Sequence, residues 1–229
     1  MSSRPRIEAA WSAVTSSVGR RDPGAAAAAI APAVREGMLQ IAGPAALLVV
    51  QASTPGPEID TLIAALDDRA WSGDDVLGEL ITAVVQGGAT GRRRLTVDLD
   101  MLADSLNQQD GGYLDLTTGT TWPLELVEMG QVDGLESFDD PDPELWLDVP
   151  GEGSHDAYGD MAEFTADLTD PRVRDDLAAS IEGRGAFRRF QDALNRHEVY
   201  RVHWRVFSTE RRTGRARAWL AEQGYDAVP

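Results

Sequence analysis

The residues best suited to binding chemistry lie in the motif from Gly183 to Leu194, which places arginines directly beside phenylalanines. Arginine side chains bind carboxylates and phosphates through paired hydrogen bonds and also stack on aromatic rings. Phe187, Phe190 and Leu194 are spaced i, i+3 and i+7, which predicts that they share one packed face of a helix. The motif also offers three candidate binding residues: Arg184, Arg188 and Arg189.

The two glycines of this motif do not form a nucleotide-binding signature. A third glycine is missing from the required register, and Gly183 and Gly185 follow a predicted helix instead of a strand. We therefore expect both glycines to end and separate helices. Arg188 and Asp192 are four residues apart, so they are predicted to form an ion pair on a second face of the helix.

Charge is distributed unevenly along the 229 residues, which carry a formal net charge of −17 and contain no lysine. Residues 95–171 contain 20 acids and no arginine, whereas residues 172–229 contain 12 arginines and 8 acids. Two explanations are open: the acidic segment pairs with the arginine-rich helices inside the protein, or one of these surfaces binds a charged partner. We favour internal pairing, because unpaired like charges repel one another within a folded chain.

No pattern in the sequence has the ligand spacing of a metal site. His197 begins a zinc-protease signature, but Arg201 occupies the position of the second histidine. His203 lies six residues from His197, which is the wrong spacing for two ligands on one helix face. The acidic loop from Asp139 to Glu144 has two prolines and no glycine, unlike a calcium loop. We predict no metal ion.

Catalytic and cofactor signatures are also missing. The glycine-rich stretch from Gly87 to Arg92 lacks the lysine and hydroxyl residue of a phosphate-binding loop. Ser154, His155 and Asp156 are adjacent, whereas the members of a catalytic triad converge from separate elements. Ser154 or Asp156 is instead expected to cap a helix. The sequence predicts no catalytic residue and no cofactor.

Composition points to a folded protein of the cytoplasm. With 42% hydrophobic residues, the chain can bury a core. It contains no cysteine, which excludes disulfides, thiolate metal sites and thiol nucleophiles. Its most apolar run, Leu39 to Val50, is shorter than the roughly 20 residues that a membrane helix needs. We also find no signal peptide, so we expect a cytoplasmic protein without membrane contact.

Residues 1–90 are predicted to form an alanine-rich, mainly helical N-terminal region. Leu47 to Gln51 could be a strand or the end of a buried helix, since periodicity does not distinguish the two. A linker is expected at residues 86–94, which are rich in glycine and arginine. Apolar spacing predicts helices over residues 7–18, 25–42, 58–67 and 76–85, with interruptions at Pro32 and at Gly43-Pro44.

Residues 95–229 are predicted to form a second domain with a small antiparallel sheet of about three strands. A short strand from Leu95 leads into a helix over residues 98–106, and a hairpin turns at Thr118-Gly119. Another strand is expected at residues 144–149, with Leu145, Leu147 and Val149 on one face. A C-terminal helical bundle then carries the arginines, with helices beginning near Asp156, Pro171, Ala186 and Glu210, and Asp170 is expected to cap the second of them. The predicted fold class is α+β.

Several motifs in this second part support a family resemblance. They are Val97-Asp-Leu, Tyr113-Leu-Asp-Leu-Thr-Thr-Gly, Trp146 to Pro150, Glu182 to Leu194, and Arg215-Ala-Arg-Ala-Trp-Leu. On these motifs the segment from about Thr96 to Tyr225 resembles the bacterial uncharacterised protein family 158 of the UPF series. The resemblance implies a shared domain, but it carries over no activity, substrate or catalytic residue.

The sequence favours a non-enzymatic binding or regulatory module that acts through a charged surface. Its partner would be a protein that meets the acidic face or the arginine-rich helix. One alternative is a binder of single-stranded nucleic acid or nucleotide phosphate through Arg184, Arg188 and Arg189, although the net charge of −17 disfavours duplex binding. The other alternative is an enzyme with an unrecognised carboxylate site, which would require acids that converge in a pocket.

Overall fold

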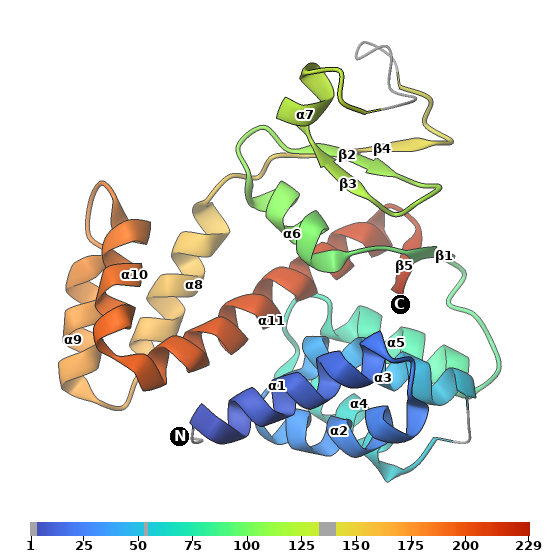
Figure 1. Cartoon of the computed structure of the whole chain (residues 1–229), viewed down its shortest axis with the longest axis horizontal. Helices are drawn as coiled ribbons and strands as arrows, with labels where there is room; N and C mark the ends of the chain where they lie inside the picture. Colours follow the sequence, from blue (N-terminus) through green and yellow to red (C-terminus); the bar gives the residue numbers. More distant parts are fainter. Residues whose placement is uncertain (1–3, 53–54, 133–140) are drawn as a thin grey trace.

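The computed structural model describes residues 4–52, 55–132 and 141–229 and shows an α+β protein in which helices predominate (Figure 1). Its N-terminal region is a helical bundle around a core that includes Ile7, Ile30 and Leu62, each at most 1% exposed. Residues 47–51 lie in the last turns of a helix, so they do not form a strand. The helices are α1 (Arg4–Gly19), α2 (Pro23–Arg35), α3 (Leu39–Ala52), α4 (Pro57–Arg69) and α5 (Asp74–Val85).

The single helix predicted over residues 25–42 is wrong, because the chain forms α2 and α3 there. Gly37 adopts a positive φ of 75°, and the N–H groups of Gly37 and Met38 bond back to carbonyls of the last turn of α2. This arrangement ends a helix. Pro32 and Pro44, which were expected to interrupt helices, lie inside α2 and α3. Each proline removes one backbone hydrogen bond, and the packing of α2 against α3 compensates.

The predicted hairpin is confirmed as part of a three-stranded antiparallel sheet. Strand β2 (Gly112–Asp115) lies in the middle, with β3 (Thr121–Pro123) and β4 (Trp146–Val149) on either side. Helix α6 (Leu99–Asn107) is capped by Asp98, whose carboxylate accepts hydrogen bonds from the first turn. Helix α7 (Leu124–Glu128) follows β3.

The alternation predicted for the third strand is only partly correct. Val149 is buried as expected, but Leu145 is 44% exposed and precedes the strand. Trp146, which was expected on the polar face, is buried in a small cluster with Val127 and Val132. The sheet is therefore covered on both faces, and a clean alternation of polar and apolar residues is lost.

A second, two-stranded sheet joins residues far apart in sequence. Strand β1 (Arg93–Thr96) pairs in parallel with β5 (Tyr225–Val228), so that Leu95 lies opposite Ala227. The sequence predicted β1 but not β5. This pairing brings the end of the chain back to the point where residues 86–92 leave the N-terminal bundle.

The C-terminal helices are α8 (His155–Ala166), α9 (Pro171–Ser180), α10 (Ala186–Arg196) and α11 (Glu198–Glu222). The predicted cap at Asp170 is confirmed, because its side chain accepts from the N–H of Arg172 (3.0 Å). Helix α11 begins at Glu198 instead of Glu210. Figure 1 shows α8, α9 and α10 gathered at one end of α11, which then passes between α6 and the N-terminal bundle.

Helix α11 contributes side chains to several cores, which explains why its apolar pattern does not follow one simple stripe. Val202 and Val206 pack with the N-terminal bundle. Ala216 and Leu220 pack with β1, β2 and α6, and Trp204 packs with α8 and α10. Among the described residues, no helix is both long and apolar enough to cross a membrane.

Candidate functional site

The loop that joins α9 to α10 is held by Arg189. Its Nε donates to the carbonyl of Ser180 (3.2 Å), and its Nη2 donates to the carbonyl of Gly183 (3.3 Å). The same guanidinium bonds to two further carbonyls of the loop. Gly183 and Gly185 turn this loop with positive φ values of 73° and 76°. Arg189 is thus committed to the backbone of its own loop, and it contacts no acidic side chain in the part of the chain that the structure describes.

Arg184 and Arg188 are placed differently from Arg189. Both side chains are exposed, and neither has a hydrogen bond or ion pair with any residue that the structure describes. The expected ion pair between Arg188 and Asp192 is not formed. These two cations therefore lie open to solvent, and their interaction with the acids of residues 95–171 is not observed among the described residues.

The two phenylalanines of the motif also differ. Phe190 is fully buried and packs edge-on against Trp204, with ring centroids 4.9 Å apart. The expected packing of Phe187 is wrong, because 41% of this residue is exposed. The buried face of α10 is centred between Ala186 and Leu194, so Phe187 falls at its edge. The exposed surface at the start of α10 therefore carries the ring of Phe187, with Arg188 next to it in sequence and Arg184 in the loop before the helix.

Internal charge pairing occurs on α11. Arg211 contacts Asp160 (3.2 Å) and Glu163 (2.9 Å), and Arg215 contacts Asp160 on its other oxygen (2.7 Å). Asp160 is only 2% exposed, so this part of the contact is shielded from water. The arginines that neutralise the acidic segment are therefore those of α11.

A pocket of about 360 Å³ opens beside these ion pairs, and Asp156, Asp160 and Glu163 all line it. Acids thus do converge in the structure, as an enzyme of the carboxylate class would require. Each of these carboxylates contacts Arg211 or Arg215, so its oxygens are occupied by guanidinium groups. Among the described residues, no group of three or more acidic or histidine side chains is arranged to hold a metal ion.

A second polar cluster is buried between α11 and the N-terminal bundle. The carboxylate of Glu210 accepts backbone hydrogen bonds from Leu39 (2.9 Å), Gln40 (2.8 Å) and Ile41 (2.9 Å). It also accepts from Nη1 of Arg69 (2.7 Å). Glu210 therefore caps the first turn of α3, whose N–H groups would otherwise have no acceptor.

The cluster continues through two further charged residues. Asp74 accepts from Arg69 (2.6 Å) and from the side-chain amide of Gln40 (2.8 Å). On the other side of Gln40, the amide oxygen accepts from Nε of Arg217 (2.9 Å), and Nη1 of Arg217 donates to the carbonyl of Ala227 (3.3 Å). A continuous hydrogen-bond network thus joins α3, α4, α5, α11 and β5.

Burial perturbs the ionisation of this network. It raises the pKa of Glu210, and the positive charge of Arg69 and the N–H groups of α3 oppose that change. Burial lowers the pKa of Arg217 to about 10, and the negative charges of Asp226, Glu210 and Asp74 oppose that change. Arg217 therefore remains a buried cation at neutral pH.

A comparison with protein families assigns the second part of the chain. The family model described as Uncharacterised protein family (UPF0158) matches residues 92–229, which is more than half of the sequence. The chain belongs to this family. No curated protein and no solved structure matches the chain significantly. The UPF0158 match confirms the resemblance inferred from the motifs, and it names no activity.

The buried network crosses the boundary of the UPF0158 region. Glu210 and Arg217 lie inside this region, whereas Arg69, Asp74 and Gln40 lie before it. The acidic residue that caps α3 is thus 169 to 171 residues away from the N–H groups that it binds. The UPF0158 region and the N-terminal bundle share a polar core.

Sequence reasoning missed Glu210 and Arg217 as buried residues. A usable signal was present, since both are charged and occur within the apolar spacing of α11, seven residues apart. Two charges at that spacing share a helix face, and burial of that face requires partners for both. The partners lie in other helices, so their identity was not readable from α11.

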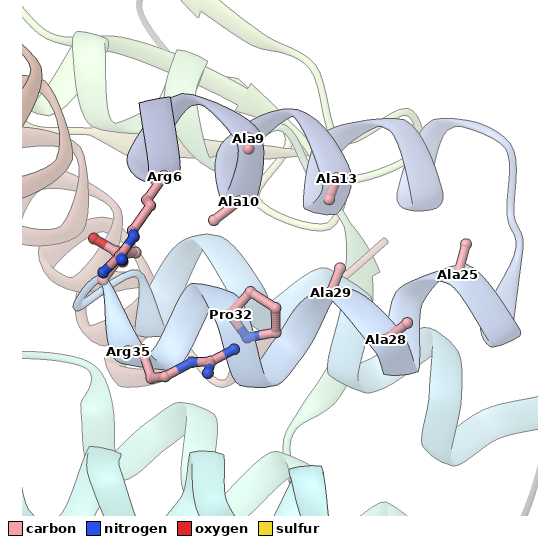
Figure 2. A pocket seen from close by; sticks show the side chains of 10 residues that line it. Arg6, Ala9, Ala10, Ala13, Ala25, Ala28, Ala29, Pro32 and Arg35 are labelled. Carbon is pink, nitrogen blue, oxygen red and sulfur yellow. The ribbon is translucent and has the colours of Figure 1, made fainter. Parts of the chain in front are cut away.

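The N-terminal bundle also has a shallow groove of about 710 Å³ between α1 and α2 (Figure 2). Its walls are mostly methyl groups of alanines, such as Ala9, Ala13 and Ala28. Arg6 and Arg35 lie together at one end of this groove, as Figure 2 shows. The small side chains explain the hollow, and they offer no reactive group.

Proposed function

We propose that the protein is a non-enzymatic, cytoplasmic binding module that contacts an acidic protein partner through the exposed surface of α10. The observation that carries this proposal is the free state of Arg184 and Arg188, which have no ionic partner among the described residues. In contrast, Arg211 and Arg215 of α11 are both neutralised internally. The lack of cysteine is compatible with a reducing compartment.

The exposed ring of Phe187 supports the same surface. Aromatic and arginine side chains are enriched at the energetic centres of protein interfaces. A ring that is 41% exposed can pack on an apolar side chain of the partner while the arginines on either side of it in sequence bind carboxylates. Acidic partners are also attracted locally although the whole chain is negative, because charge–charge interactions beyond about 10 Å are screened at moderate salt.

The same surface favours a second candidate, the binding of single-stranded nucleic acid. Bases stack on exposed aromatic rings, and arginines contact the phosphates on either side. Phe187 between Arg184 and Arg188 has this composition. The overall charge of −17 opposes a long polyanion more than a short acidic peptide segment, which places this candidate second.

The proposal is tested with the full-length protein immobilised at low ionic strength and exposed to native lysate. The test variant combines Arg184→Ala and Arg188→Ala. A control variant combines Arg20→Ala and Arg94→Ala, which removes the same charge from exposed arginines elsewhere. We expect the wild type and the control to retain one stoichiometric acidic protein, and the test variant to lose it at least tenfold.

A parallel measurement follows fluorescence anisotropy of a labelled single-stranded oligonucleotide and of a polyglutamate peptide. Binding of the peptide should weaken as salt rises and should be lost in the test variant. If only the oligonucleotide binds in this way, the nucleic-acid candidate replaces the protein partner. If neither probe distinguishes the test variant from the control and no stoichiometric partner is recovered, the α10 surface is not a binding site.

A further inference from the structure

A cavity of about 430 Å³ lies where α1, α3, α11, β5 and the start of α6 meet. This volume falls within the roughly 300–1,000 Å³ of small-molecule sites. The cavity lies at the junction of the N-terminal bundle with the UPF0158 region, away from the exposed surface of α10 (Figure 1). Its occupancy would therefore be a property separate from the proposed partner surface.

Most of the cavity wall is apolar and comes from elements on both sides of the junction. Helix α1 contributes a half-buried indole and two valines, and α3 contributes a proline ring and a leucine. The start of the UPF0158 region supplies the facing wall. The apolar residues that line the cavity include Trp11, Val14, Pro44, Leu47, Val97 and Leu99.

Three of the polar residues that line the cavity form a row on α11. Thr209, Thr213 and Arg217 all line it, and their spacing of four residues places them on one face of the helix. Thr213 is only 8% exposed and Arg217 only 1%. A row of hydrogen-bonding groups thus faces a mostly apolar wall, as in sites that orient a small ligand.

The hydroxyls of this row lack the partner that buried helical threonines usually have. Thr165 in α8 shows the usual arrangement, with its hydroxyl bonded to the carbonyl of Met161 (2.7 Å). Neither Thr209 nor Thr213 forms a side-chain hydrogen bond with any residue that the structure describes. Neither hydroxyl belongs to the buried side-chain atoms that lack a partner, so both are accessible from the cavity, where an acceptor or donor of a ligand can bond with them.

Arg217 adds unused donors to the same face. Its Nε and Nη1 bond to Gln40 and Ala227, whereas Nη2 has no acceptor among the described residues. A guanidinium carries five N–H donors and no acceptor, so a complementary group has to offer an oxygen.

Charge at the cavity selects against an anion. Asp98 and Asp100 line the cavity and are exposed. The positive charge of Arg217 interacts electrostatically with three buried carboxylates, those of Asp226, Glu210 and Asp74. These carboxylates already offset its charge without contacting it. A ligand carboxylate would face repulsion from these acids, whereas an alcohol or carbonyl oxygen would not.

We propose that this cavity binds a neutral small molecule with an apolar body and a single alcohol or carbonyl oxygen. The apolar body lies against α1, α3 and residues 97–99, and the oxygen hydrogen-bonds with the row formed by Thr209, Thr213 and Arg217. The apolar body and the oxygen of the ligand each have a matching part of the cavity wall, so one polar contact fixes the orientation of the ligand.

The test is isothermal titration of the full-length protein with 1-octanol and with octanoate. Wild type should bind 1-octanol at one saturable site and should bind octanoate more weakly. Thr213→Val keeps the shape and removes the hydroxyl, so 1-octanol affinity should fall about five- to tenfold. Thr61→Val changes an exposed threonine of α4 and should leave the affinity unchanged.

The unliganded protein supplies a second readout. Because the hydroxyl of Thr213 has no described partner, Thr213→Val should leave the Tm without ligand unchanged or higher. Val97→Trp fills the cavity from a half-buried position and should abolish 1-octanol binding. The proposal is overturned by an absence of saturable binding, by equal affinity of wild type and Thr213→Val, or by tighter binding of octanoate than of 1-octanol.

Discussion

Glu210 provides the sharpest test of how the two parts of the chain are held together. Its carboxylate is 1% exposed and accepts three backbone N–H groups of α3 and one guanidinium, that of Arg69. Replacement by alanine leaves these donors without an acceptor and removes the partner of a largely buried cation. Breaking a buried ion pair in this way costs about 3–5 kcal/mol.

A loss of this size is large relative to the roughly 5–15 kcal/mol that stabilises a typical domain. With a urea m-value of about 2–3 kcal/mol per molar, Glu210→Ala should lower the unfolding midpoint by about 1–2 M. Glu210→Gln keeps the size and one acceptor oxygen, so its loss should be smaller, about 2–3 kcal/mol. Tryptophan fluorescence and circular dichroism in urea measure both values.

The matched control is Glu8→Ala. Glu8 also pairs with an arginine, Arg4, at 2.9 Å, but both side chains are at least 40% exposed. Exposed ion pairs contribute about 0–1 kcal/mol, so this variant should unfold within about 0.5 M urea of the wild type. If Glu210→Ala is no more destabilising than Glu8→Ala, the cost of burying the carboxylate cancels its contacts, and the reasoning is refuted.

Three other substitutions probe separate contacts by urea unfolding. The hydrogen bonds that Asp176 accepts from Arg196 and from His197 lower its pKa, so its contribution is present above about pH 4 and is lost as pH falls through its folded value. Because the pair is exposed, Asp176→Asn should cost at most about 1 kcal/mol at neutral pH and should flatten the acid-side loss. A Cβ at Gly214 would lie 2.2 Å from the carbonyl oxygen of Ser72, so Gly214→Ala should cost at least about 1–3 kcal/mol. Arg189→Ala should cost about 1–3 kcal/mol and increase proteolysis between α9 and α10, whereas equal protease resistance would contradict its role as a loop clamp.

Features that depend on neighbouring residues were predictable. Asp170 caps its helix as expected, because a capping side chain bonds within three residues of itself. The hairpin around Gly119 is fixed by its turn in the same way. These interactions close short loops, so the local sequence contains both partners.

Features that depend on distant partners were not predictable. The partner of β5 is β1, which lies about 130 residues earlier, and a four-residue strand has no periodicity of its own. The charge segregation correctly indicated internal pairing, but arginine spacing alone could not show that Arg211 and Arg215 would bind Asp160 while Arg188 would not. What distinguishes these arginines is which elements of the fold pack against them.

The exposure of Phe187 could not be predicted for the same reason, although only one helix is involved. Its spacing to Phe190 allows a shared face, yet a helix buries only an arc of its surface, and the position of that arc is set by the elements that cover it. In α10 the arc includes Ala186, because α9 and α11 approach from that side. The larger residue is left at the edge, which turns an expected core side chain into a surface one.

The contact of α11 with the N-terminal bundle is partly polar, because the hydrogen bonds of Glu210 and Arg217 lie beside the apolar packing of Val202 and Val206. Apolar faces tolerate small shifts along a helix, because any methyl group can replace another at similar cost. The hydrogen bonds of Glu210 and Arg217 each require one acceptor or donor at one position, so they fix the rotation and the axial position of α11. That same fixed position presents Thr209 and Thr213 to the cavity beside α1. The buried network therefore determines the geometry of the polar row as well as the joining of the two regions.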